Sequence, residues 1–305
     1  MAETIDIPPE LDMVTADEAA AFRRDGFVIP RRGLDSESTA ALRETIEEVL
    51  ADNRDWHNIV RMPHIPKREG QAEGVIGGEK LFRIAIHPQI VAAARALIGP
   101  DLIMWGGEIF AKPAGIGKST PWHQDSYTPA VKAGPGREFA RSAMIWIAVD
   151  PVDVGNGCLR FVPGSGRSGR VGHSIGAKAN AMLDFEVEDA SVHFDTAVNA
   201  ELAPGHFSAH DLFVVHGANA NTSGRRRAGI TFHYMSAEDV YDRSFGSAFG
   251  SASEGKPAPI AQRPIWLVLG ENRHPGNDFT IGHAGLEDLD AMAEANRQRL
   301  NRIFG

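Results

Sequence analysis

The chain has 305 residues, of which 43% are hydrophobic and 23% charged, as expected for a globular protein with a sizeable core. A net charge of −9, with no basic block beyond Arg225-Arg226-Arg227, argues against a nucleic-acid partner. No apolar run approaches the roughly 20 residues that a membrane helix needs, and residues 1–6 lack the features of a secretion signal. The single cysteine, Cys158, cannot form an internal disulfide, so we expect a cytoplasmic protein. We expect no membrane partner, because the sequence has no membrane-spanning run.

The first third of the chain is predicted to be helical. Thr15 and Glu18 have the spacing of a capping box, and residues 26–30 follow as a short strand that ends at a proline. A second helix begins near Asp35 or Ser36, with Leu42, Ile46 and Leu50 on one face. A third helix covers residues 89–98 and ends at a Gly-Pro pair.

From Leu102 the sequence changes to short runs rich in β-branched and aromatic residues, separated by Gly/Pro clusters. Strands are predicted at residues 102–112, 142–150, 159–162, 211–216 and 230–235, with glycine-rich loops at 113–118 and 163–172. Residues 173–202 are interpreted as an insertion of mixed structure, and residues 286–303 as an amphipathic helix. Helices first and strands later indicate a β-barrel or a double-sheet jelly roll braced by N-terminal helices.

A His-x-Asp pair, His123-Gln124-Asp125, lies in the first part of the strand-rich region. Two ligands one residue apart on an extended segment point to the same side, so both can bind one metal ion. A histidine from a distant strand would complete a triad of two histidines and one carboxylate. That donor set leaves open positions and is typical of non-haem Fe(II) oxygenases.

A bare His-x-Asp pair is weak evidence in a chain with 12 histidines, and a second pair occurs at His193-Phe194-Asp195. His216 follows the first pair by 93 residues, which leaves room for several strands, but it follows the second by only 23. If His233 were the distal ligand, Arg227 would no longer follow that ligand along the chain. We therefore predict His123, Asp125 and His216 as the metal ligands, and the second pair as surface or loop residues.

Arg227 stands 11 residues past His216, where a turn at 219–224 returns the chain antiparallel. 2-Oxoglutarate chelates iron through its keto acid end, and a planar guanidinium binds its distal carboxylate bidentately. The alternative is that Arg225, Arg226 and Arg227 are all solvated turn charges. We accept this for the first two, but Arg227 opens an apolar strand and is predicted to be buried.

Over about residues 16–236 these features together resemble the phytanoyl-CoA dioxygenase family in its broad bacterial sense. The resemblance is carried by Arg24-Asp25-Gly26-Phe27, Leu81-Phe82-Arg83, His87-Pro88, Gly99-Pro100, Lys112-Pro113, His123-Gln124-Asp125, Trp146-Ile147-Ala148-Val149-Asp150, Asn156-Gly157-Cys158-Leu159, Pro163-Gly164-Ser165, His216-Gly217, Asn221 and Arg227.

The resemblance implies a mainly β fold with flanking helices, a cupin-like double-stranded β-helix, with Fe(II), 2-oxoglutarate and O2 as cofactor and co-substrates. It also implies that Trp146 lies against 2-oxoglutarate, although plain core packing is the alternative. We expect a single domain over residues 1–305. It would comprise a helical part at about 15–100, a jelly-roll core at about 101–236 and a C-terminal extension at about 237–305, whose helix would form a homodimer contact.

Three positions depart from the family pattern. Gly166 replaces a histidine, for which His173 is a nearby substitute, His206 replaces the aspartate of a Gly-Asp pair, and Ala218 replaces a frequent serine. None is a predicted ligand, but together they weaken any transfer of substrate identity.

Several further residues could contact the site. Gln124 and Tyr127 flank the metal pair and could face substrate, while His210 shares the strand parity of His216 but is interpreted as a structural histidine. Residues 61–68, which include Arg61, Lys67 and Arg68, could close over the site.

The predicted activity is hydroxylation of an aliphatic C–H bond of a small molecule, with succinate and CO2 as co-products. Halogenases of this superfamily carry a small residue in place of the carboxylate, so the presence of Asp125 favours hydroxylation, or a related desaturation. Two alternatives remain: a cupin-like metalloenzyme that does not use 2-oxoglutarate, and a non-catalytic binding module on the same fold. Family members act on acyl-CoA thioesters, amino acids, phosphonates and terpenoids, so the substrate stays open.

Overall fold

Two antiparallel sheets form the body of the computed structural model, which describes residues 8–53, 59–69, 74–127, 130–176, 181–244 and 260–304. The larger sheet has seven strands in the order β1-β11-β6-β13-β3-β15, with β2 also paired to β3. These strands are β1 (Phe27–Val28), β2 (Ile59–Arg61), β3 (Leu102–Lys112), β6 (Ser142–Ala148), β11 (Phe207–His210), β13 (Arg227–Ser236) and β15 (Trp266–Leu269).

The smaller sheet has four strands in the order β10-β7-β12-β4. Two further two-stranded pairs join β14 to β5 and β8 to β9. The bounds are β4 (Thr120–His123), β5 (Val131–Lys132), β7 (Leu159–Phe161), β8 (His173–Ile175), β9 (Phe185–Val187), β10 (Val198–Ala200), β12 (His216–Ala218) and β14 (Val240–Tyr241).

Helices precede and follow the sheets, as predicted. Thr15 caps α1 (Ala16–Asp25) through a full capping box with Glu18, and the Asp35 side chain caps α2 (Ser36–Asp52). The predicted third and C-terminal helices correspond to α4 (Pro88–Ile98) and α5 (Glu287–Phe304). Sequence analysis missed α3 (Gly78–Ala85), a short helix that starts from two glycines and therefore lacks a side-chain cap.

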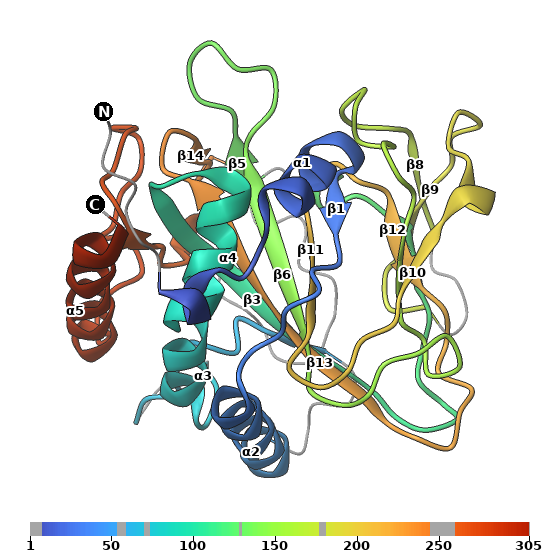
Figure 1. The fold of residues 1–305 in the computed structure, drawn as a ribbon, viewed down its shortest axis with the longest axis horizontal. Coiled ribbons are helices and arrows are strands. Elements are labelled where there is room, and N and C mark those ends of the chain that lie inside the picture. The colour runs from blue at the N-terminus through green and yellow to red at the C-terminus, as the bar shows by residue number, and fades with distance from the viewer. Residues whose placement is uncertain are drawn as a thin grey trace.

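The main hydrophobic core lies between the large sheet and helix α4, which crosses it over β6 (Figure 1). Residues of β6 are buried throughout because its second face is covered as well. That second face meets the small sheet, where Trp146, Cys158, Phe161 and Val214 belong to one buried cluster. The space between the two sheets therefore holds the side chains that line the candidate site.

One predicted strand is wrong: residues 211–216 do not form a continuous strand. β11 ends at His210 and β12 begins at His216, and the two belong to different sheets. The Asp211 carboxylate accepts the backbone N–H groups of Phe213 and Val214, at 2.8 and 2.7 Å, and so stabilises a turn. The chain uses this turn to cross from the large sheet to the small one.

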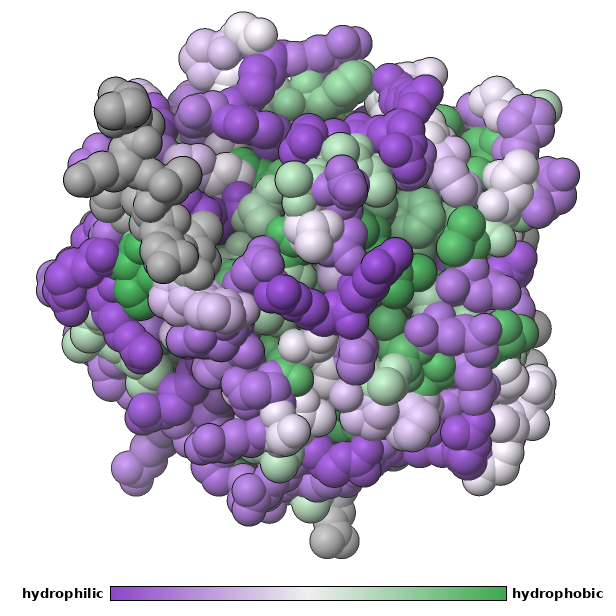
Figure 2. All heavy atoms as spheres, viewed as in Figure 1, coloured by the Kyte–Doolittle hydropathy of each residue, from purple (hydrophilic) through white to green (hydrophobic). Residues whose placement is uncertain are grey.

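The insertion predicted at residues 173–202 has mixed structure, with β8, β9, β10 and the short helix η3 (Phe194–Thr196); residues 177–180 lie outside the described part. Helix α5 buries its apolar side chains, Leu289, Ala293 and Leu300, in the main core. Figure 2 shows a face covered mostly by hydrophilic side chains, with hydrophobic ones in smaller areas between them. In the part of the chain described, no single helix has the length and apolarity to cross a bilayer, and only the bent pair α3–α4 passes that test in combination.

Candidate active site

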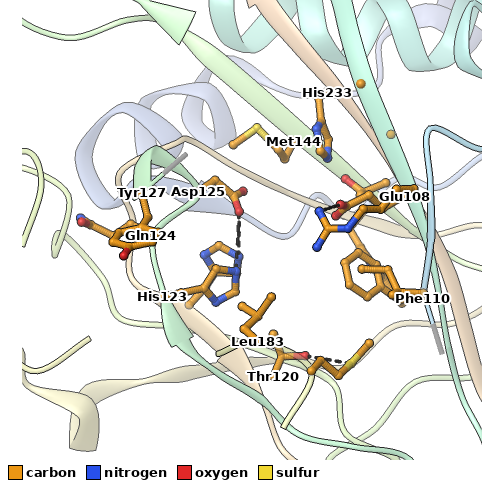
Figure 3. Close-up of a pocket in the computed structure, with 18 of the residues that line it drawn as sticks. Glu108, Phe110, Thr120, His123, Gln124, Asp125, Tyr127, Met144, Leu183 and His233 are labelled. Carbon is orange, nitrogen blue, oxygen red and sulfur yellow. Dashed lines mark hydrogen bonds and ion pairs between the residues drawn. The ribbon is translucent and has the colours of Figure 1, made fainter. Parts of the chain in front are cut away.

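The predicted triad comes together between the two sheets. His123 ends β4, His216 begins β12 and is its direct register partner, and Asp125 opens the short helix η2 (Asp125–Tyr127). Asp125 Oδ1 lies 3.6 Å from His123 Nε2 and 3.9 Å from His216 Nε2, and one potential ligand atom from each residue lies within 4.8 Å of the others. In Figure 3 the His123 and Asp125 side chains point toward each other on the cavity wall. This arrangement suits one metal ion.

Backbone carbonyls fix the orientation of both imidazoles. The Nδ1 of His123 lies 2.9 Å from the carbonyl oxygen of Pro121, and the Nδ1 of His216 lies 3.1 Å from that of Val214. Since a carbonyl only accepts, each Nδ1 carries the proton, and each Nε2 is left with its lone pair toward Asp125. Metal ligation through Nε2 needs this tautomer.

Burial and mutual proximity set the charge states of the triad. Burial, reinforced by the neighbouring imidazoles of His123 and His210, holds the pKa of His216 well below its usual range, so its ring is neutral at neutral pH. Burial alone would raise the pKa of Asp125, but the adjacent histidines His216, His123 and His210 hold it well below its usual range. His216 therefore offers a neutral nitrogen donor, and Asp125 offers an ionised carboxylate.

His210 holds the other oxygen of the Asp125 carboxylate. Its Nε2 lies 3.2 Å from Asp125 Oδ2, and the residue is only 4% exposed. An ionised carboxylate accepts only, so His210 donates from Nε2. Oδ1 then remains for the metal, which gives this histidine, predicted to be structural, a direct role in orienting a candidate ligand.

We expect His210→Phe to lower the affinity for Fe(II) or Co(II) by about 10- to 100-fold, because phenylalanine keeps the ring but cannot orient Asp125. Calorimetric titration of the metal-free protein with Co(II) measures this affinity directly. His193→Phe, at an exposed position, is the matched control and should bind metal like the wild type. Equal metal affinity in both variants would show that the hydrogen bond is dispensable.

Arg227 is buried at the start of β13, as predicted, with 1% of its surface exposed. Its Nε and one terminal nitrogen both donate to the carbonyl of Gly157, at 3.1 and 2.8 Å, and its guanidinium lies 4.8 Å from the Trp146 ring centroid. Among the residues described, no carboxylate shifts its pKa: burial lowers it and the Cys158 thiol opposes this. Burial lowers the pKa of Arg227 only to about 10, so it stays charged.

Lys112 is the register partner of Arg227 across β3 and β13, and it is fully buried. Its Nζ donates to the carbonyl of Asn219 at 2.6 Å. Burial, with a smaller effect from the neighbouring Arg227, lowers the pKa of Lys112 to about 6. Lys112 is therefore largely neutral at neutral pH, and Arg227 is the fixed cation at this end.

The two arginines before Arg227 differ from each other. Arg225 is exposed, as predicted for a turn charge, and pairs with Asp153. For Arg226 the prediction of a solvated charge is wrong, because its guanidinium bridges Asp150 and Glu47 and is half-buried. This pair of contacts ties the turn to helix α2.

Trp146 lies on the face of β6 that points toward the small sheet, and it is 2% exposed. Thr231 of β13 is its register partner. The ring fits only because Gly229 has no side chain: an added Cβ would lie 2.0 Å from a ring carbon. The ring therefore packs as a core residue and also contacts Arg227. Its contact with 2-oxoglutarate stays a prediction.

Gly229→Ala should displace Trp146 and destabilise the protein by about 1–3 kcal/mol, the usual cost of overpacking a core. The measurement is urea unfolding followed by fluorescence. Gly224→Ala is the control, because an added Cβ there meets no atom within 4 Å. Equal unfolding midpoints for the two variants would show that the ring moves aside without cost.

A cavity of about 430 Å³ opens on the triad and Arg227. Tyr127 lines it and stacks on Phe185 of β9 with ring centroids 4.3 Å apart. Gln124 also borders it, but its fully buried side chain bonds Val171 and Gly169, so it anchors the glycine-rich loop. His173 contacts the same residue: its Nε2 accepts the backbone N–H of Gln124 at 3.3 Å.

Sequence analysis did not single out Glu108, Met144 or Arg263, all of which line the cavity, and it considered His233 only as an alternative ligand. His233 stands on the wall and outside the triad. His193 and Asp195 are exposed, as predicted, and neither belongs to the metal-binding triad.

The family model for phytanoyl-CoA dioxygenase (PhyH) matches residues 22–229. The chain belongs to this family. Within the family, an ectoine dioxygenase of Sphingopyxis alaskensis is 26% identical over 263 residues, which cover 81% of this chain and 85% of the relative. The peroxisomal phytanoyl-CoA dioxygenase of Mus musculus is 20% identical, covering 74% of this chain and 70% of the relative.

Solved structures share the fold. The apo form of the non-heme monooxygenase ThoJ is 24% identical, covers 94% of this chain and 98% of its own, and has a TM-score of 0.62. EctD from S. alaskensis, solved with 2-oxoglutarate and 5-hydroxyectoine, is 21% identical, covers 84% and 90%, and has a TM-score of 0.59. The predicted jelly roll is confirmed, and as a PhyH family member the chain is a non-haem iron oxygenase that uses 2-oxoglutarate.

Proposed function

We propose that the protein hydroxylates an aliphatic C–H bond of a small molecule, with iron held by His123, Asp125 and His216. In this proposal Arg227 binds the distal carboxylate of 2-oxoglutarate, and Trp146 packs beside it. The observation that carries it is a fully buried guanidinium, without an acidic partner among the described residues, that opens on the same cavity as the triad. An anion would stabilise a desolvated charge of this kind, and 2-oxoglutarate supplies one.

The side chains fit the two groups they would hold. Two imidazole nitrogens and one carboxylate oxygen converge from one side, which leaves the cavity side open to co-substrate and O2. Bound iron supplies, with 2-oxoglutarate and O2, the oxidising chemistry needed at an unactivated C–H bond. The chain's own contribution is to orient the ligands and to keep the site dry with apolar walls such as Met144, Leu159 and Phe185.

A substrate screen tests this proposal. Added compounds are scored by O2 uptake, by succinate formed per 2-oxoglutarate consumed, and by the mass of the product. A productive compound should raise succinate formation and gain one oxygen atom. A product that has lost two hydrogens would show desaturation instead, and metal-dependent turnover without succinate would favour a cupin-like enzyme.

We propose that residues 1–305 form one domain with a small-molecule substrate. A homodimer through α5 stays a prediction, although the apolar side chains of that helix already pack within the chain. The cytoplasmic location also stays a prediction.

A further inference from the structure

The cavity wall opposite the triad carries a histidine that the proposed function does not use. His233 lies on β13 and lines the cavity, and in Figure 3 its ring stands beside Met144, across the open space from His123. Among the described residues, nothing forms a hydrogen bond with either of its ring nitrogens, and Nδ1 is buried. The residue keeps part of its surface exposed, and because β13 is paired on both sides, that surface faces the cavity.

Neighbouring groups hold the imidazole in place and favour one tautomer. The Trp105 ring packs against it with centroids 4.8 Å apart, and Nδ1 lies against Gly106, where an added Cβ would be 2.9 Å away. An N–H at Nδ1 would be packed against this glycine and left unpaired, and orphaned buried N–H groups are rarer than under-satisfied acceptors. The proton is therefore expected on Nε2, which makes His233 a hydrogen-bond donor toward the cavity.

The wall around His233 leaves this neutral donor for a ligand. Burial lowers the pKa of His233, so its ring is neutral at neutral pH. The charged residues Arg61 and Glu108, which line the same cavity, bond each other at 2.8 Å. Thr231 Oγ1 and Trp105 Nε1 have no partner in the described part of the chain, but both atoms are buried. The His233 imidazole therefore remains as a neutral polar contact for a ligand.

Strand register places His233 close to the triad. His233 and His210 are both register partners of Met144, on opposite sides of β6. Since neighbouring strands are about 4.8 Å apart, the two histidines stand about 10 Å apart on the same face of the sheet. His210 in turn lies 3.2 Å from Asp125. A ligand oxygen bound at His233 would therefore lie a few bonds from a carbon placed at the metal.

We infer that His233 is a substrate-binding residue, and that its Nε2–H donates a hydrogen bond to an oxygen of the substrate. The substrate is then a small molecule with a carbonyl or hydroxyl oxygen a few bonds from the C–H that is oxidised. The inference rests on the proposed function and deepens it for the same site. The lining residues Met144, Phe110 and Leu183 support it, because they are apolar and a hydrogen bond is stronger where water is excluded.

The test uses the full-length protein loaded anaerobically with Fe(II) and saturating 2-oxoglutarate, and follows its visible charge-transfer band. The probes are matched pairs, cyclohexanone with methylenecyclohexane and cycloheptanone with methylenecycloheptane, titrated until the band shifts. Within each pair an accepting oxygen is replaced by a CH2 group of similar shape. The ratio of the alkene Kd to the ketone Kd, compared between wild type and variant, therefore isolates the hydrogen bond.

His233→Phe keeps an aromatic ring and loses the donor, so it should lower this ratio by about 10-fold, as expected when a buried carbonyl is left unpaired. His233→Gln, whose side-chain amide can donate from near the position of Nε2, should recover part of the ratio. The exposed His193→Phe is the matched control and should give the wild-type ratio. If His233→Phe fails to fold by circular dichroism, His233→Met replaces it, since methionine is apolar and adaptable.

The tautomer provides a second, independent measurement. A long-range proton–nitrogen NMR spectrum of the metal-free protein, with the His233 signals assigned by their loss in His233→Gln, should show a neutral ring protonated at Nε2. A proton on Nδ1 instead would overturn the inference.

A Kd ratio that is unchanged in His233→Phe would also overturn it, and so would the absence of binding by both ketones to the wild type. These results differ from a failure of the proposed function, in which the Fe(II)–2-oxoglutarate band itself would not form in the wild type.

Discussion

Replacing Arg227 with alanine is expected to raise the apparent KM for 2-oxoglutarate by roughly 10²- to 10³-fold or more. The guanidinium is fully buried, so its removal would leave the distal carboxylate desolvated and unpaired. Losing one partner of a buried ion pair costs on the order of 3–5 kcal/mol, which corresponds to that change in affinity. Iron affinity in the absence of co-substrate should barely change, because Arg227 is not among the residues that could hold the metal.

Three neighbouring variants act as controls for Arg227. Arg227→Lys should recover only part of the loss, since an ammonium cannot reproduce the planar fork. Arg225→Ala should behave like the wild type, and Arg226→Ala should lower stability without raising KM, because it loses the bridge to Asp150 and Glu47. A large KM effect in Arg226→Ala and none in Arg227→Ala would contradict the assignment.

Single alanine substitutions at His123, Asp125 and His216 are expected to abolish turnover and to leave the fold intact. Each removes one of three donors whose ligand atoms lie within 4.8 Å of one another, and two donors hold a divalent iron weakly. The measurements are iron content after dialysis and circular dichroism. The control is Asp195→Ala, the exposed aspartate of the second His-x-Asp pair. Iron loss in that control, with iron retained in Asp125→Ala, would mean that the second pair holds the metal.

Much of the sheet could be predicted because its strands are rich in β-branched residues and are separated by Gly/Pro clusters. The predicted strand at 102–112 coincides with β3, and β6 ends within two residues of its predicted end. The failure at 211–216 has a local cause: the apolar run of Leu212 to Val215 reads as a strand, but the Asp211 side chain bonds the following N–H groups and turns the chain. Helix α3 was missed because glycines stand where a cap would be.

The metal triad could be predicted because it combines a local motif with a spacing, and Arg227 because it opens an apolar strand. The charged residues on the opposite cavity wall were only partly predictable. Arg61 belongs to the segment 61–68 that was expected to close over the site, and it lines the cavity. Nothing in the sequence indicates that the pairing of β2 with β3 sets it beside Glu108, or that Arg263 lines the same cavity. The role of His210 was likewise hidden, since its contact joins the end of β11 to Asp125 in η2, 85 positions earlier in the chain.

The most direct test of the central claim is an anaerobic titration of the Fe(II)-loaded protein with 2-oxoglutarate, recorded in the visible range. If His123, Asp125 and His216 hold an iron that 2-oxoglutarate chelates, a weak charge-transfer band should appear only when both are present. It should require much more 2-oxoglutarate in Arg227→Ala and should be absent in His216→Ala. A wild-type protein that binds iron but gives no band, or a band that is unchanged in His216→Ala, would contradict the account.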